Sequence, residues 1–207
     1  MNITQGNTEC LLRNLAENVA SAIQSSADVL NSQVVTLPSL QDAQYVPTIP
    51  YGTDRPPVAH QFLKMFRPEG SVRKIVQQLQ ALDSALIWGH APGYDPENVG
   101  QKFLDNYCHA LITGPDGPLM CNYPLGAFVL FGPGTFYKEH SHAPNEVYLA
   151  LSDGGQWKVG AHDWQPLNAG QTIFIPSNTV HAIQAGDKPL LTFSFWLEPG
   201  EIAEIDI

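Results

Sequence analysis

The chain has few positively charged residues. Its 207 residues include 10 lysines and arginines against 20 aspartates and glutamates, which gives a formal net charge of -10 at pH 7. This balance opposes attraction to phosphate backbones and to anionic lipid. We therefore expect neither nucleic acid nor a membrane as a partner. The excess of acidic side chains serves either solubility or an electrostatic field that favours cationic ligands.

Cysteine and long apolar runs are also scarce. Cys10, Cys108 and Cys121 lie far apart and lack the paired spacing of a thiolate zinc site or a disulfide framework, so we expect them to be reduced and buried. The sequence shows no apolar run of about eighteen residues and no basic region followed by an apolar stretch at its start. These absences predict a cytoplasmic protein and leave open whether it is a monomer or a homodimer.

Proline and glycine divide the chain into a helical part and a β-rich part. Apolar periodicity predicts helices at 8–30, 58–66, 71–89 and 95–114, with an irregular proline-rich connection at 38–57. After the turn cluster at 114–118, short β-type runs predict strands at 127–131, 146–151, 156–159, 172–175, 179–184 and 190–197. We therefore predict an α+β fold, in which a helical N-terminal extension over 1–114 covers a small antiparallel β-barrel over 115–207.

Two segments gather imidazole and carboxylate groups at the spacing of a metal site. The first contains His140, His142, Glu146 and Tyr148, and the second contains His181. Residues of like parity share one face of an extended chain, so the first four side chains can project to the same side. Neutral imidazoles combined with a carboxylate suit zinc, iron, manganese or nickel better than calcium or magnesium. The sequence thus predicts a site for one divalent transition metal.

The four remaining histidines have no companions at ligand spacing. We interpret them as ordinary core or solvated histidines. They are His60, His90, His109 and His162.

The two segments resemble the two motifs of the cupin superfamily. The first motif is represented by Gly134, His140, His142 and Glu146, and the second by Gly170, Pro176 and His181. Two departures occur: the closing glycine of the first motif comes one residue late, at Gly154, and Asn178 stands where a glycine normally follows the proline. Asparagine tolerates the left-handed conformation that a turn requires there.

Within this superfamily the chain is similar to the cupin-type dimethylsulfoniopropionate lyases of marine bacteria, the DddQ-like branch. The resemblance is carried by Tyr137, Tyr148 and Trp196, together with the metal motif and the helical leader. It implies a cupin barrel, also called a double-stranded β-helix or jelly roll. It also implies a metal site, with Zn, Fe(II) or Mn as the ion. The implied ligands are His142, Glu146 and His181, with His140 as a fourth and Tyr148 or water completing the shell.

The implied reaction is a β-elimination that converts dimethylsulfoniopropionate into acrylate and dimethyl sulfide. A metal-bound substrate carboxylate would stabilise the developing enediolate, and Tyr148 would act as the general base. Tyr137 would orient the small zwitterionic substrate or share the proton transfer. The face of Trp196 would receive the sulfonium group, as aromatic faces receive quaternary ammonium ligands. Each of these aromatic residues could instead be an ordinary part of the barrel wall.

Two other functions remain open from the sequence. One is a cupin Fe(II) dioxygenase that acts on a small carboxylate or thiol substrate. The other is a non-catalytic sensor that keeps the barrel but not the chemistry, although no output module is evident in the helical leader. The dioxygenase should consume oxygen with turnover, whereas elimination requires none.

Overall fold

The N-terminal half of the protein is mainly helical. The computed structural model describes residues 5–26, 28–30, 37, 39–47, 55–122 and 124–198. Its helices are α1 (Gln5–Ser25), α2 (Pro57–Phe62), α3 (Arg73–Leu82) and α4 (Gln101–Asp105), with 3-10 turns at Leu63–Met65, Gly70–Val72 and Asp83–Ala85. No helix among the residues described has the length and apolar character that a membrane crossing demands.

The first predicted helix exists, but its bounds differ from the prediction. It begins before Thr8 and ends at Ser25, whereas the apolar spacing suggested a helix that continued to Leu30. Beyond the helix, the Asp28 carboxylate accepts hydrogen bonds from the backbone N–H groups of Leu30 and Phe174. Asp28 also forms a β-bridge with Thr172. These contacts draw the chain to the edge of a sheet, which a local helical pattern does not reveal.

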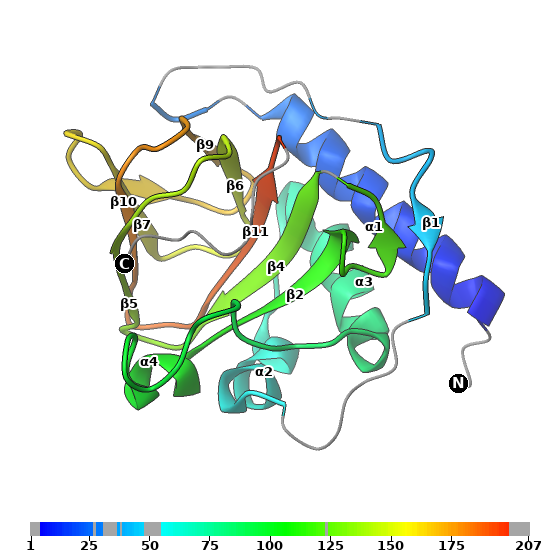
Figure 1. Cartoon of the computed structure of the whole chain (residues 1–207), viewed down its shortest axis with the longest axis horizontal. Helices are drawn as coiled ribbons and strands as arrows, with labels where there is room; N and C mark the ends of the chain where they lie inside the picture. The colour runs from blue at the N-terminus through cyan, green and yellow to red at the C-terminus, as the bar shows by residue number, and fades with distance from the viewer. Residues whose placement is uncertain are drawn as a thin grey trace.

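Two β-sheets form the rest of the molecule (Figure 1). The seven-stranded sheet has the order β1-β3-β2-β4-β11-β6-β9, and the four-stranded sheet has the order β5-β10-β7-β8. All pairs are antiparallel except β2 with β3. The strands are β1 (Gln44–Tyr45), β2 (Tyr107–Gly114), β3 (Leu119–Met120), β4 (Leu125–Phe131), β5 (Phe136–His140), β6 (Glu146–Ala150), β7 (Gly155–Val159), β8 (Gln165–Leu167), β9 (Thr172–Ile175), β10 (His181–Ala185) and β11 (Leu190–Trp196).

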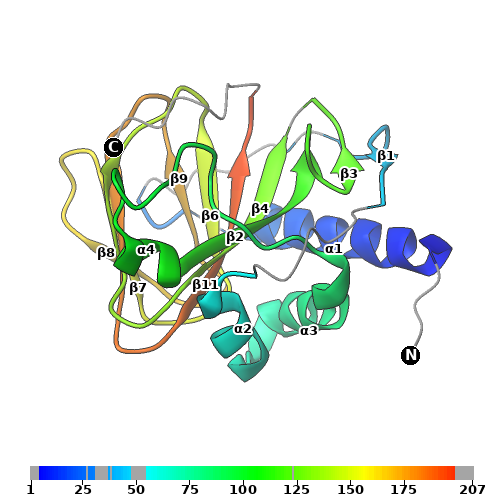
Figure 2. The ribbon, with the colours of Figure 1, turned by 60° about the horizontal axis from the view of Figure 1, so that its bottom comes forward.

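Successive side chains of a strand point to opposite faces, and nearly all residues of β4, β6 and β11 are buried, so the centre of the larger sheet is covered on both faces. Helices α1 and α3 lie against its outer face (Figure 2), and their apolar residues share one core with alternate residues of the strands. On β11, for example, Phe193 and Phe195 belong to this core, whereas Ser194 and Trp196 face the barrel interior. This arrangement confirms the predicted α+β fold with a cupin-type antiparallel barrel covered by helices.

The predicted helix at 95–114 is wrong. Only Gln101–Asp105 is helical, and Tyr107–Gly114 forms strand β2, which pairs with β4. An apolar run of this length fits either structure, and the partner strand decides between them. The sheet therefore begins before Gly114, where the β-rich part was expected to start.

The expected state of the cysteines is confirmed only in part. Cys10, Cys108 and Cys121 are free thiols. Cys108 is buried and Cys121 half-buried, but Cys10 is exposed on α1, so the expectation that all three are buried is wrong. The exposed position follows from the amphipathic pattern of α1, whose polar face points to solvent.

Candidate metal centre and active site

The predicted metal ligands come from three strands and one loop. His140 ends β5, His142 follows in the connecting loop, and Glu146 opens β6. His181 opens β10 and lies directly opposite His140 in the antiparallel register of β5 and β10. Asn178, just before His181, adopts the left-handed conformation expected for that turn, with φ of 55°. The two motifs thus meet inside the barrel although they are distant in sequence.

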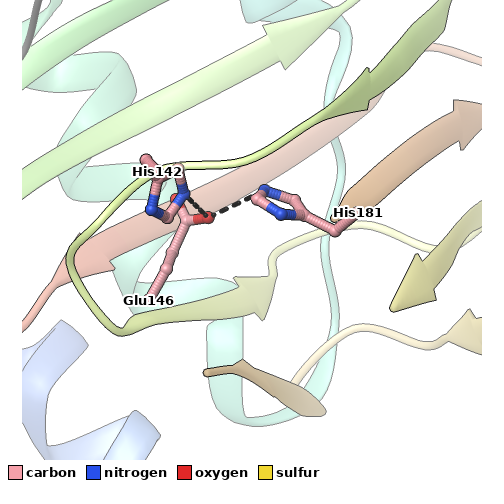
Figure 3. A group of neighbouring side chains, drawn as sticks. All are labelled: His142, Glu146 and His181. Atoms are coloured by element: carbon pink, nitrogen blue, oxygen red, sulfur yellow. Dashed lines mark hydrogen bonds and ion pairs between the residues drawn. The ribbon is translucent and has the colours of Figure 1, made fainter. Parts of the chain in front are cut away.

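Three of these side chains form a close group. Ligand atoms of His142, Glu146 and His181 all lie within 4.8 Å of one another (Figure 3). The Oε2 atom of Glu146 lies 3.0 Å from Nε2 of His142 and 3.4 Å from Nε2 of His181. All three residues are buried, with exposed fractions of 4% or less. Two imidazole nitrogens and a carboxylate oxygen converging on one point match the donor set of a transition-metal site.

The other ring nitrogen of each histidine is held by the backbone. Nδ1 lies 2.9 Å from the Pro144 carbonyl in His142 and 2.9 Å from the Thr179 carbonyl in His181. A carbonyl oxygen only accepts hydrogen bonds, so Nδ1 carries the proton and Nε2 keeps its lone pair in the neutral ring. A lone pair facing a carboxylate oxygen is favourable only with a cation or a proton between them. The group therefore fits a bound metal ion.

The charges of the group also require a cation or a proton between Glu146 and the imidazoles. Burial opposes ionisation of Glu146, but the neighbouring His142 and the hydrogen bonds from His142 and His181 hold its pKa well below the usual range. Burial likewise opposes protonation of His142, but the Glu146 carboxylate raises its pKa. The ionised form of this carboxylate is thus favoured deep in the barrel, and it requires a positive charge beside it, which a bound cation or a proton on His142 can supply.

The second oxygen of Glu146 is held by β11. Oε1 accepts a hydrogen bond from the indole N–H of Trp196 at 3.0 Å and another from the hydroxyl of Ser194. The Trp196 ring also lies 4.4 Å from the His142 ring, measured between centroids. Trp196, predicted as a receptor for the substrate, therefore orients the carboxylate of Glu146. The alternating pattern of β11 places Ser194 on this inner face, and only the folded structure reveals its contact with Glu146.

Replacing Trp196 by Phe should weaken metal binding by about 10- to 100-fold, because such a hydrogen bond to a ligand carboxylate typically contributes that much. Competition with a metal-binding dye measures the affinity. Trp164, which is partly exposed and contacts Phe136 on the protein surface, provides the matched control, and Trp164→Phe should bind metal as the wild type does. Equal affinities of Trp196→Phe and the wild type would contradict this role.

His140 lies beside the close group rather than within it. Its ring centroid is 4.1 Å from that of His181 and 6.4 Å from that of His142. Nδ1 of His140 lies 2.8 Å from the carbonyl of Lys138, so its Nε2 lone pair is also available. The Tyr137 ring stacks on His140 at 3.9 Å. Ligation by His140 stays a prediction.

Both predicted tyrosines lie inside the barrel. Tyr148 follows Glu146 on β6 and faces the same interior cavity. Burial, and then the charge of Glu146, raise the pKa of Tyr148 well above its usual value. The Tyr137 hydroxyl shares a short hydrogen bond with the Tyr94 hydroxyl, and burial raises its pKa as well. Without a neighbouring cation, both phenols are therefore neutral.

These side chains surround a cavity of about 280 Å³. It extends from Glu146 on β6 across β11 and β4 to β2, along the inner face of the larger sheet. Several lining residues were not predicted, and those on β2 were missed because this strand was mistaken for a helix. The additional lining residues are His90, Ala91, Pro92, Tyr107, His109, Leu111, Asp116, Leu125, Ala127 and Val129.

Two solved structures with similar folds are described as DMSP lyases. One, described as part of "Crystal structures of DMSP lyases RdDddP and RnDddQII", has a TM-score of 0.78 and 21% identity, and the match covers 97% of this chain and 98% of that one. The DMSP lyase DddQ of Ruegeria pomeroyi DSS-3 has a TM-score of 0.74 and 21% identity, with 96% of each chain covered. At this level of identity, the likeness shows a common fold.

Sequence comparisons identify the family. The chain is 30% identical over 113 residues to dimethylsulfoniopropionate lyase DddQ of Ruegeria pomeroyi, covering 54% of this chain and 56% of that protein. It is 30% identical over 129 residues to the putative dimethylsulfoniopropionate lyase DddL of Cereibacter sphaeroides, covering 61% of this chain and 52% of that protein. The matched region thus spans about half the length of each curated relative. The family model described as dimethylsulfoniopropionate lyase matches residues 34–192, which is well over half of the chain, and the protein therefore belongs to the dimethylsulfoniopropionate lyase family.

Proposed function

We propose that this protein is a metal-dependent carbon–sulfur lyase that cleaves dimethylsulfoniopropionate into acrylate and dimethyl sulfide. The proposal rests above all on the buried group of His142, Glu146 and His181, which opens onto a cavity that also contains Tyr148. Family membership supports the substrate class, and the donor group with Tyr148 beside it supports the proposed ion and base.

The reaction is an elimination in which one proton and one sulfide leave adjacent carbons. A base removes the proton from the carbon next to the carboxylate, the new electron pair forms the double bond, and the carbon–sulfur pair departs with dimethyl sulfide. The proton is the difficult part, because a carbon beside a carboxylate is very weakly acidic. When bound, a divalent cation supplies the positive charge that stabilises the developing enediolate and favours the phenolate form of a nearby tyrosine.

Tyr148 is the proposed general base. It lies two residues after Glu146 on the same strand, so both side chains face the interior. Its side chain is buried where it borders the cavity, so bulk water competes little for the proton. Tyr137 borders the same cavity, and its hydroxyl is fixed by Tyr94, which suits a role in orienting substrate or passing on the proton.

Aromatic rings suit the sulfonium end of the substrate. A sulfonium has no N–H donors, so the face of an aromatic ring is its natural receptor. Trp196 was proposed for this role from the sequence, and its ring lines the cavity together with those of Tyr107 and Tyr137. The indole N–H of Trp196 is engaged by Glu146, which leaves the ring face as the part that can contact substrate.

Metal-loaded protein supplied with dimethylsulfoniopropionate should release dimethyl sulfide, and a chelator should abolish the release. Headspace gas chromatography measures the product. Zinc, ferrous iron and manganese, added back separately to the chelated protein, identify the ion that restores activity. Protein that releases no more dimethyl sulfide than its chelated form would refute the proposal.

Oxygen distinguishes elimination from the dioxygenase alternative. Elimination has no oxidation step, so the rate under nitrogen should equal the rate in air, and an oxygen electrode should record no uptake during turnover. Oxygen consumption in proportion to product would instead support a ferrous dioxygenase.

A further inference from the structure

The cavity contains a charged side chain that the reaction scheme does not use. Asp116 lies in the turn between β2 and β3 and lines the cavity at the β2 side, across β4 and β11 from Glu146. Asp116 is exposed, whereas the metal-binding group is buried, so it marks the side on which the cavity meets solvent. The cavity therefore runs from a buried metal group to an exposed carboxylate.

No positive side chain in the part of the chain that the structure describes balances this carboxylate. Among the described residues that line the cavity there is no lysine or arginine, and Asp116 forms no hydrogen bond or ion pair with any residue that the structure describes. Burial, and then the nearby His90, lower the pKa of the neighbouring His109 to about 4, so His109 is neutral at pH 7. The negative charge of Asp116 therefore acts on whatever occupies the cavity.

The substrate of the proposed function carries opposite charges at its two ends. Its carboxylate belongs at the metal group, which places the sulfonium on the side that faces Asp116. We propose that Asp116 is a specificity-determining residue that orients the zwitterion through space and selects ligands with a cationic end. This inference rests on the proposed function for the identity of the substrate.

The same charge should help the product to leave. Elimination removes the positive sulfur as neutral dimethyl sulfide and leaves acrylate, which has only a negative charge. Asp116 attracts the sulfonium end of the substrate but repels the acrylate anion. A single carboxylate thus strengthens the binding of substrate and weakens the binding of product.

The test compares substrate with anions that lack the positive charge. Suitable anions are acrylate and 4-methylpentanoate, in which a C–H group replaces the sulfonium sulfur without changing the shape of the chain. In Asp116→Asn, the KM for dimethylsulfoniopropionate should rise by about three- to fivefold, as expected for one charge acting over several ångströms in a partly solvated site. Both anions, measured by isothermal titration calorimetry, should bind equally well or more tightly.

A matched variant controls for the loss of one negative charge. Asp187 lies exposed in the turn between β10 and β11 and does not line the cavity, so Asp187→Asn should leave all three affinities unchanged. The inference is overturned if Asp116→Asn weakens substrate and 4-methylpentanoate alike, or if Asp187→Asn reproduces its effect. Unaltered substrate binding in Asp116→Asn also overturns it.

Failure of the proposed function can be recognised separately. If wild-type protein releases no dimethyl sulfide, that function fails, and calorimetry with dimethylsulfoniopropionate itself then replaces the KM. The inference then predicts that Asp116→Asn loses part of the wild-type preference for dimethylsulfoniopropionate over 4-methylpentanoate. An equal preference of the wild type and Asp116→Asn for these two ligands would reject the role of Asp116 regardless of catalysis.

Discussion

Replacing Tyr148 by Phe should lower kcat for dimethyl sulfide release by about 10²- to 10⁴-fold, the usual contribution of a positioned general base. The ring that packs inside the barrel is retained, and only the hydroxyl is lost. Metal content, measured by mass spectrometry of the purified protein, should stay at the wild-type level, because His142, Glu146 and His181 are unchanged. Substrate should still bind, which calorimetry can measure without interference from turnover.

Tyr45→Phe is the control for this experiment. Tyr45 lies on β1 at the edge of the larger sheet and does not border the cavity, so its hydroxyl should be dispensable. Two results would contradict the role of Tyr148 as base. Activity within about threefold of wild type would show that another group takes the proton, and loss of metal together with activity would show that Tyr148 is a ligand.

Replacing Glu146 by Gln should lower metal affinity by at least about 100-fold, at or above the upper end of what supporting residues contribute. The amide has nearly the same shape but lacks the charge that balances a divalent cation. Activity should fall with metal content, and excess metal should restore only part of it. Dye competition gives the affinity, and headspace analysis gives the activity.

Glu139→Gln provides the comparison for the loss of a carboxylate nearby. Glu139 lies on β5 next to His140, but it is exposed and pairs with Lys158 at 2.8 Å on the surface. An exposed pair of this kind contributes little to stability, so the variant should fold and bind metal normally. Equal metal affinity in both variants would mean that Glu146 is not a ligand.

Much of the barrel could be predicted because its sequence signals are local. The strand at 172–175 was predicted with its exact bounds, and the strand at 190–197 was predicted to within one residue. Turn residues and the alternation of polar and apolar side chains specify a strand within a few positions, and the strands that form here agree with these local signals. The left-handed conformation of Asn178 was also predicted correctly, because asparagine tolerates this conformation better than most residues do.

The missing parts of the prediction depend on contacts between distant residues. Tyr107–Gly114 has a pattern that a helix could also adopt, and only its pairing with β4 makes it a strand. This error hid His109 and Tyr107 from the predicted site, although both line the cavity. Tyr94 was missed for a related reason, because its contact with Tyr137 joins the connection before β2 to strand β5.

The backbone contacts of the three imidazoles affect how readily an ion can be captured. Each ring is anchored through Nδ1 to a carbonyl, and Nε2, the nitrogen that would bind an ion, takes no part in these bonds. The loss of rotational freedom in these side chains therefore occurs when the chain folds, not when the ion arrives. The barrel should thus act as a rigid receptor that different divalent ions enter without remodelling, so that cellular supply decides which one it carries.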